Sequence, residues 1–120
     1  MIKTSYDGKH NAVVIEFAGK INPAQAEQNL LDIHKVIPKH RKGFKVLVDL
    51  SELENMDLTV QEPIAKAMDL LNAHGVTKVV RVIPDPAKDI GLNILSIFHY
   101  SKNVKILTVE SRKDALERLR

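Results

Sequence analysis

Acidic and hydroxyl side chains gather in one stretch of this 120-residue chain, between residues 49 and 62. Clustered carboxylates can hold a hard cation, and a hydroxyl or carboxylate near the start of a helix can carry or cap a charge. The residues concerned are Asp49, Ser51, Glu52, Glu54, Asp57, Thr59 and Glu62. This stretch is the first place to look for function.

The same stretch lacks the partners that catalysis or metal binding would need. Asp49 resembles the phosphoacceptor of response-regulator receiver domains, but the acidic pair and the lysine that hold Mg²⁺ in those domains are absent here. The acids lack the regular spacing of a calcium loop, and the five histidines form no metal-binding spacing. The chain has no cysteine, and its five glycines form no phosphate loop. We therefore expect no catalytic residue, no metal, no cofactor and no enzymatic activity.

Composition indicates one globular domain spanning residues 1–120. The chain is 44% hydrophobic and 28% charged, and it shows neither a signal peptide nor an apolar run long enough to cross a membrane. Together with the absence of cysteine, this favours a cytoplasmic protein without membrane insertion. Bases cluster between residues 34 and 45, and acids follow, so the chain is dipolar. A charged helix C-terminus explains the basic cluster better than a nucleic-acid surface, because aromatic residues are not interleaved with it.

The acidic stretch lies between a predicted strand and a predicted helix. Residues 44–50 form a nearly continuous β-prone apolar run, typical of a strand that is covered on both faces. Residues 51–62 then read as a loop. The following helix begins either at Thr59, with Glu62 completing a capping box, or at Pro63, and it ends near His74 and Gly75.

The remaining elements follow from periodicity and capping signals. Residues 2–6 and 12–18 predict a hairpin with a two-residue turn at Asp7 and Gly8, and Gly19 ends the second strand. Asn22, Pro23 and Gln25 mark the start of the first helix. Strands are predicted at 78–83 and 104–109, a third helix at 90–100, and a short last helix that Ser111 caps.

This order of elements predicts an α/β fold with right-handed crossovers. It reads β-β-α-β-α-β-α-β-α, which implies a mostly parallel mixed sheet of about five strands, one antiparallel edge strand and about four helices. With this order, residues 46–68, VLVDLSELENMDLTVQEPIAKAM, resemble the STAS domain of anti-sigma-factor antagonists (SpoIIAA-like proteins) and sulphate-transporter tails.

The STAS resemblance implies a regulatory function carried out by binding a protein partner, such as a regulatory kinase or an anti-sigma factor. It places Asp57 and Thr59 in a phosphorylation or switch loop, with Thr59 at the position of the family's phosphorylatable serine. Leu58 and Val60 depart from the family's serine and glycine, so the phosphorylation loop is degenerate. The residues expected to contact the partner are Ser51, Glu52, Glu54, Leu58 and Glu62.

The predicted third helix suggests a second surface, since it is more apolar than one buried face requires. Leu92, Leu95 and Tyr100 are expected to point outward or toward a groove. A symmetric homodimer is the commonest way to bury such a patch. The alternative is a small apolar ligand or lipid bound in a groove beside this helix.

Overall fold

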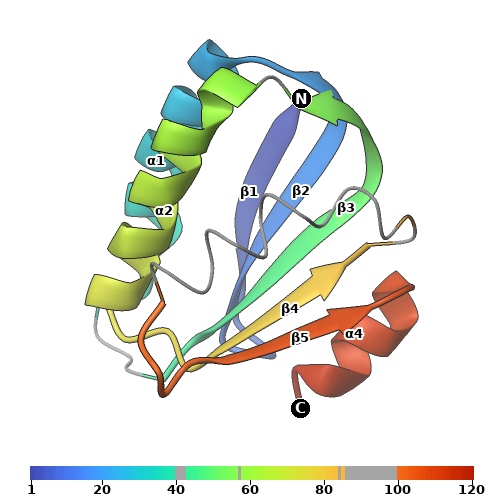
Figure 1. The fold of residues 1–120 in the computed structure, drawn as a ribbon. Helices are drawn as coiled ribbons and strands as arrows, with labels where there is room; N and C mark the ends of the chain where they lie inside the picture. The colour runs from blue at the N-terminus through green and yellow to red at the C-terminus, as the bar shows by residue number, and fades with distance from the viewer. Residues whose placement is uncertain (40–42, 57, 84, 86–99) are drawn as a thin grey trace.

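A five-stranded sheet forms the centre of the computed structural model, which describes residues 1–39, 43–56, 58–83, 85 and 100–120 (Figure 1). Strand order follows the sequence, from β1 at one edge to β5 at the other. β1 is antiparallel to β2, and every other neighbouring pair is parallel, which confirms the predicted mixed sheet. The strands are β1 (Ile2–Asp7), β2 (Ala12–Ile21), β3 (Lys45–Met56), β4 (Lys78–Val82) and β5 (Lys105–Val109).

Helices cover both faces of the sheet unequally. α1 (Pro23–Val36) and α2 (Gln61–Ala73) lie together on one face, and the short α4 (Arg112–Arg118) lies against the other (Figure 1). A single 3-10 turn, η1 (Leu58–Val60), precedes α2. The described residues thus contain three α-helices where four were predicted, and all of the predicted helix at 90–100 except Tyr100 lies outside them. No helix in the described ranges is both long and apolar enough to cross a membrane.

Alternation along the strands divides the apolar side chains into two cores. Val46 and Val79 point into the larger core beneath α1 and α2, whereas Leu47 and Val80 point into the smaller core. Leu119, immediately after α4, is fully buried in that smaller core. The buried parallel strands are therefore covered on both faces, as their continuous apolar sequences predict.

Local capping signals give the starts of α1 and α4 correctly. Asn22 caps α1: its side-chain oxygen accepts from the Gln25 N–H at 2.9 Å, and the Gln25 side chain accepts from the Asn22 N–H at 2.8 Å. The Ser111 hydroxyl likewise accepts from the Asp114 N–H at 3.2 Å and caps α4. Both caps confirm the sequence prediction, because each depends only on residues close in the chain.

Two boundaries differ from prediction. β3 continues through residues 51–56, which were expected to form a loop, and pairs there with β2 residues 18–21. Register shifts on either side of Ala18 and Gly19 allow this pairing, and Gly19, at φ 71°, lies within β2 instead of ending it. The β1–β2 connection spans residues 8–11, so the predicted two-residue turn is wrong. Asn11 adopts φ 51° in that connection.

Candidate functional site

The start of α2 differs from both predicted starts. η1 passes directly into a helix that begins at Gln61, with Val60 as a buried N-cap residue that makes no side-chain capping bond. Thr59 is therefore an exposed residue in the middle of η1 and not the cap of α2. Pro63 is the third residue of α2, where the missing N–H costs no helical hydrogen bond.

Exposed acidic side chains and one exposed leucine lie along the end of β3, η1 and the start of α2. Leu58 leaves 78% of its surface exposed. Glu62, one turn further along, is also exposed and pairs with Lys66 at 3.4 Å. On β3, Glu52 and Glu54 are exposed on either side of the buried Leu53. We call this set, Glu52, Glu54, Leu58, Thr59 and Glu62, the β3–α2 surface; Asp57 lies outside the described residues.

Ser51 belongs to a different group of residues, on the α4 side of the sheet. The Asp49 carboxylate accepts from the Ser51 backbone N–H at 2.9 Å and from the Ser51 hydroxyl at 2.6 Å. Its other oxygen accepts from Arg112 Nη1 at 3.0 Å, and Arg112 Nη2 lies 3.5 Å from Glu16 Oε1. The predicted partner-binding residue Ser51 therefore has its hydroxyl committed to a neighbouring carboxylate.

The Asp49 carboxylate is held in its charged form. Burial raises the pKa of Asp49, but hydrogen bonds from Ser51 and Arg112 lower that pKa further than burial raises it, so the net shift is downward. A carboxylate fixed in this way positions β2, β3 and α4 and is poorly suited to accept a proton. Arg112 was missed by sequence reasoning because 63 residues separate it from Asp49 and no local pattern connects them.

Within the described residues, the acids do not assemble into a cation site. No group of three or more histidine, cysteine, aspartate or glutamate side chains there has the geometry to hold a metal ion. The side chains of Glu52 and Glu54 are exposed to solvent on β3, whereas the Asp49 side chain points toward Arg112. These carboxylates are therefore close in sequence, but their side chains point in different directions.

Tyr100 corrects one sequence prediction, because it is buried. It is only 9% exposed and belongs to the larger core, so it does not point outward. Burial raises the pKa of the Tyr100 phenol, although the nearby Arg81 charge acts in the opposite direction. Leu92 and Leu95 lie outside the described residues, and the homodimer stays a prediction.

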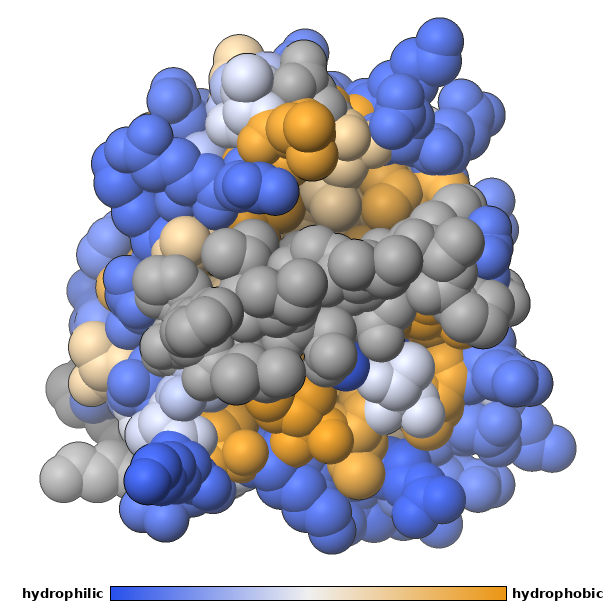
Figure 2. Space-filling view, viewed as in Figure 1, coloured by the Kyte–Doolittle hydropathy of each residue, from blue (hydrophilic) through white to orange (hydrophobic). Residues whose placement is uncertain are grey.

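Tyr100 also lines a small apolar hollow between the sheet and α2. The hollow measures about 40 Å³ and is bounded by Phe17, Asn29 and Met68 among other core residues. Figure 2 shows hydrophobic side chains of described residues gathered on this side of the molecule, with hydrophilic residues around them. The hollow is about the size of one water molecule.

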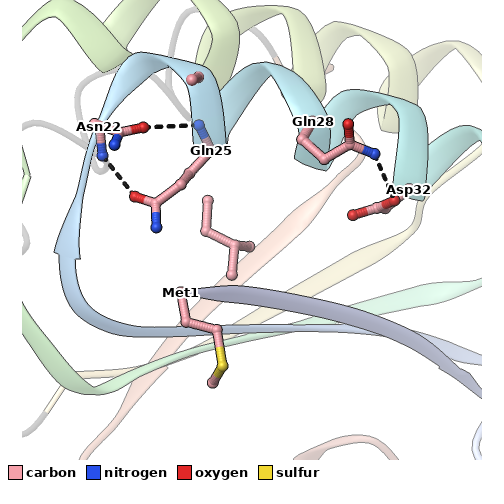
Figure 3. Close-up of a pocket in the computed structure, with 7 residues that line it drawn as sticks. Met1, Asn22, Gln25, Gln28 and Asp32 are labelled. Carbon is pink, nitrogen blue, oxygen red and sulfur yellow. Dashed lines mark hydrogen bonds between the residues drawn. The ribbon is translucent and has the colours of Figure 1, made fainter.

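A second depression, an open groove of about 450 Å³, lies between the start of β1 and the first turns of α1 (Figure 3). The Asn22 and Gln25 side chains that line it each accept a hydrogen bond from the other residue's backbone N–H, and the Gln28 amide donates to the Asp32 carboxylate at 3.2 Å. These bonds cap α1 and join successive turns of it.

Known structures share this fold. No family model matches the sequence, and no curated protein matches it. A Shewanella loihica protein of SpoIIAA-like fold aligns over all of this chain and 93% of its own, with a TM-score of 0.71 at 16% identity. The phosphorylated form of the Bacillus cell fate determinant SpoIIAA aligns over both full chains, with a TM-score of 0.68 at 15% identity. An anti-sigma factor antagonist from Mycobacterium paratuberculosis covers 100% of this chain and 95% of its own, with a TM-score of 0.61 at 20% identity.

These likenesses define the architecture of the chain. Its strand order, mixed sheet and helix placement are those of a single STAS-like domain. More particularly, the chain has the SpoIIAA-like fold, which confirms the resemblance predicted from residues 46–68 at the level of fold.

Proposed function

We propose that this chain is a non-enzymatic regulatory domain that binds a protein partner through the β3–α2 surface. The support is twofold. The chain shares its fold with proteins described as anti-sigma factor antagonists, and the β3–α2 surface occupies the position of the switch loop in the sequence resemblance. A domain of this kind acts by changing which partner is bound, so it needs an exposed recognition surface more than a reactive group.

Leu58 is the observation that carries the proposal. A single exposed leucine is ordinary on a protein surface. Leu58, however, is the most exposed of the large hydrophobic side chains in the described ranges, and it is the first residue of η1, where partner recognition is proposed. Burying a leucine side chain stabilises a complex by about 1.5 to 3 kcal/mol. Leu58 is thus the side chain from which this surface can gain most on binding.

The acidic residues of the β3–α2 surface indicate the chemistry of the partner. Glu52 and Glu54 are exposed near the carboxyl end of β3, and Glu62 is exposed at the start of α2. Complementary charge steers association and selects among partners. The partner should therefore present an apolar pocket for Leu58, rimmed by lysine or arginine side chains.

Phosphorylation of Thr59 is not required by this proposal. A phosphate there would add about 1.5 to 2 negative charges close to Glu62. Pro63 also removes one of the first backbone N–H groups of α2 that could otherwise bind a phosphate. Both features oppose a phosphorylated state, although Thr59 is exposed.

A variant that replaces Leu58 with a charged residue tests the proposal. Bait protein carrying Leu58→Glu is compared with unaltered bait and with Leu31→Glu, a matched control because Leu31 is a 55% exposed leucine on α1. We expect one specific protein to be recovered by the unaltered bait and the control but not by Leu58→Glu. Titration of that purified protein should show at least tenfold weaker binding to Leu58→Glu, corresponding to about 1.4 kcal/mol. Equal affinities for all three baits would contradict the proposed surface.

The alternative of an apolar ligand gains no support from the described residues. The hollow at Tyr100, about 40 Å³, is far below the roughly 300 Å³ at which ligand pockets begin. Leu92 and Leu95, also predicted to line a groove there, lie outside the described residues, and we do not propose ligand binding as the function.

A further inference from the structure

Three lysines occupy equivalent positions on three neighbouring strands. Lys45, Lys78 and Lys105 each begin a strand, and the sheet register pairs Lys45 with Lys78 and Lys78 with Lys105. Two residues later, each strand contributes an apolar side chain to the smaller core under α4. The three lysines therefore share the α4 face of the sheet. We call them the lysine row; at about 4.8 Å per strand, its ends are roughly 10 Å apart.

Within the described residues, this row has no carboxylate partner. Lys45 Nζ donates to the His10 carbonyl at 2.9 Å, and Lys78 Nζ donates to the Arg118 carbonyl at 2.8 Å. These bonds hold two ammonium groups in place, but each ammonium has three N–H donors and keeps two for other acceptors. No salt bridge within the described ranges joins the row to an acid. The nearby Asp7 pairs with His10 at 2.7 Å.

Such a row is unfavourable for the isolated domain. Like charges directly opposite each other on adjacent strands destabilise a sheet, and Arg118 brings a further positive charge to the same region. The two backbone bonds explain the positions of Lys45 and Lys78, but they do not explain why Lys105, which is exposed, is also a lysine. An anionic partner would remove the repulsion.

The chemistry of the row favours an acidic protein segment. Single-stranded nucleic acids are usually bound with aromatic side chains for stacking, and the described tyrosines do not serve this purpose: Tyr100 is buried and the Tyr6 hydroxyl donates to Asn11. Lysine also lacks the planar fork with which arginine grips a phosphate. Polybasic lipid-binding sites usually gather four to eight charges beside a membrane anchor. In an extended peptide with the polyproline II conformation, residues three apart lie on the same side and about 9 Å apart, which matches the span of the row.

We propose that the lysine row binds an extended acidic segment of a protein, with carboxylates about three residues apart contacting Lys45 and Lys105. This site goes beyond the proposed function. It lies at the amino ends of β3, β4 and β5, whereas the β3–α2 surface lies at the other end of the sheet (Figure 1). The domain would then contact two segments of opposite charge at its two ends.

Fluorescence anisotropy with defined peptides tests this site. The probe is a short fluorescein-labelled peptide with glutamate at every third position, and the control peptide carries glutamine at those positions. We expect the glutamate peptide to bind, and its affinity to fall with added salt as the screening length shortens from about 30 Å at 0.01 M to about 8 Å at 0.15 M. Equal binding of both peptides would overturn the proposal.

A matched pair of charge reversals locates the binding. Lys105→Glu should weaken the glutamate peptide about five- to tenfold, since it removes one attraction and adds one repulsion of surface strength. Lys113→Glu changes the net charge equally but lies exposed in the first turn of α4, away from the row, and should bind like the unaltered protein. Thermal unfolding of both variants checks that they are folded. Equal weakening by both reversals would overturn the site.

Parallel titrations with duplex DNA and with phosphatidylserine vesicles separate the other anionic partners. Both should bind more weakly than the glutamate peptide and should not distinguish Lys105→Glu from Lys113→Glu. The assignment to an acidic protein segment would be overturned if DNA or vesicles bound more tightly than the glutamate peptide and if only Lys105→Glu abolished that binding.

Discussion

The Arg112–Asp49 pair should contribute more to stability than an exposed ion pair in the same protein. Arg112 Nη1 lies 3.0 Å from Asp49 Oδ2, and the Asp49 side chain is only 13% exposed. Lys66 and Glu62 provide the comparison, since they are 3.4 Å apart and 63% and 79% exposed. A partly buried, charge-assisted hydrogen bond contributes about 1.5 kcal/mol, whereas an exposed pair on one helix contributes about 0.3 to 0.5 kcal/mol.

Two double-mutant cycles measure this difference. One cycle combines Arg112→Ala with Asp49→Asn, and the other combines Lys66→Ala with Glu62→Gln. Urea denaturation gives the free energy of unfolding of each variant, and the non-additive part of each cycle is the coupling energy. Removing the Arg112–Asp49 pair should destabilise α4 first, because a helix of seven residues depends on contacts with the sheet. Coupling energies that agree within error would refute the account of Arg112 as a tie between α4 and the sheet.

The same contacts determine how the stability contributed by Asp49 depends on pH. The pKa of Asp49 is lower in the folded protein than its ordinary value of 3.8. The carboxylate's contribution to stability is therefore fully present above pH 3.8, and it is lost as the pH falls through the lower, folded pKa. The Arg112–Asp49 coupling should accordingly be unchanged from pH 7 to pH 5 and decrease only in stronger acid. A decrease already at pH 5 would show that Asp49 is not held in its charged form.

The remaining predictions concern stability and use the free energy of unfolding in urea as the measurement. Asn22→Ala should cost about 1 kcal/mol by removing the capping box of α1. Thr59→Ala should change stability by less than about 0.5 kcal/mol, because Thr59 is exposed and does not cap α2; a loss near 1 kcal/mol would restore the capping interpretation. Leu119→Ala should cost about 2 to 5 kcal/mol, since Leu119 is fully buried in the smaller core, whereas Leu116→Ala on the exposed side should cost less than 1 kcal/mol.

Sequence reasoning succeeded where the deciding interaction is local. The start of α1 depends on Asn22, Pro23 and Gln25, which are adjacent or nearly so, and their residue types alone specify the cap. The mostly parallel sheet was predicted because each strand after the hairpin was expected to follow a helix, and a helix between two strands is typical of a crossover connection between parallel strands. Both inferences needed no knowledge of distant contacts.

Prediction from the sequence failed where pairing between distant residues overrides the local pattern. In residues 50–56 the apolar side chains recur at Leu50, Leu53 and Met56, a spacing of three that does not predict a strand. The register shifts with β2 make this spacing compatible with one core, because each shift turns the chain relative to its partner. The tie between Arg112 and Asp49 was missed for the same reason, since only the folded sheet brings them together.

The extension of β2 and β3 has a consequence for the order in which the domain opens. Beyond Ala18 and Asp49, these two strands pair only with each other in the described part of the sheet, whereas residues 46–49 have a paired strand on each side. A two-stranded ribbon has fewer neighbours to keep its amides from solvent than a strand in the centre of a sheet. Amide hydrogens of residues 52–56 should therefore exchange with deuterium well before those of residues 46–49. The β3–α2 surface would thus open locally while the five-stranded centre stays closed, and a bound partner would slow exchange at the ribbon first.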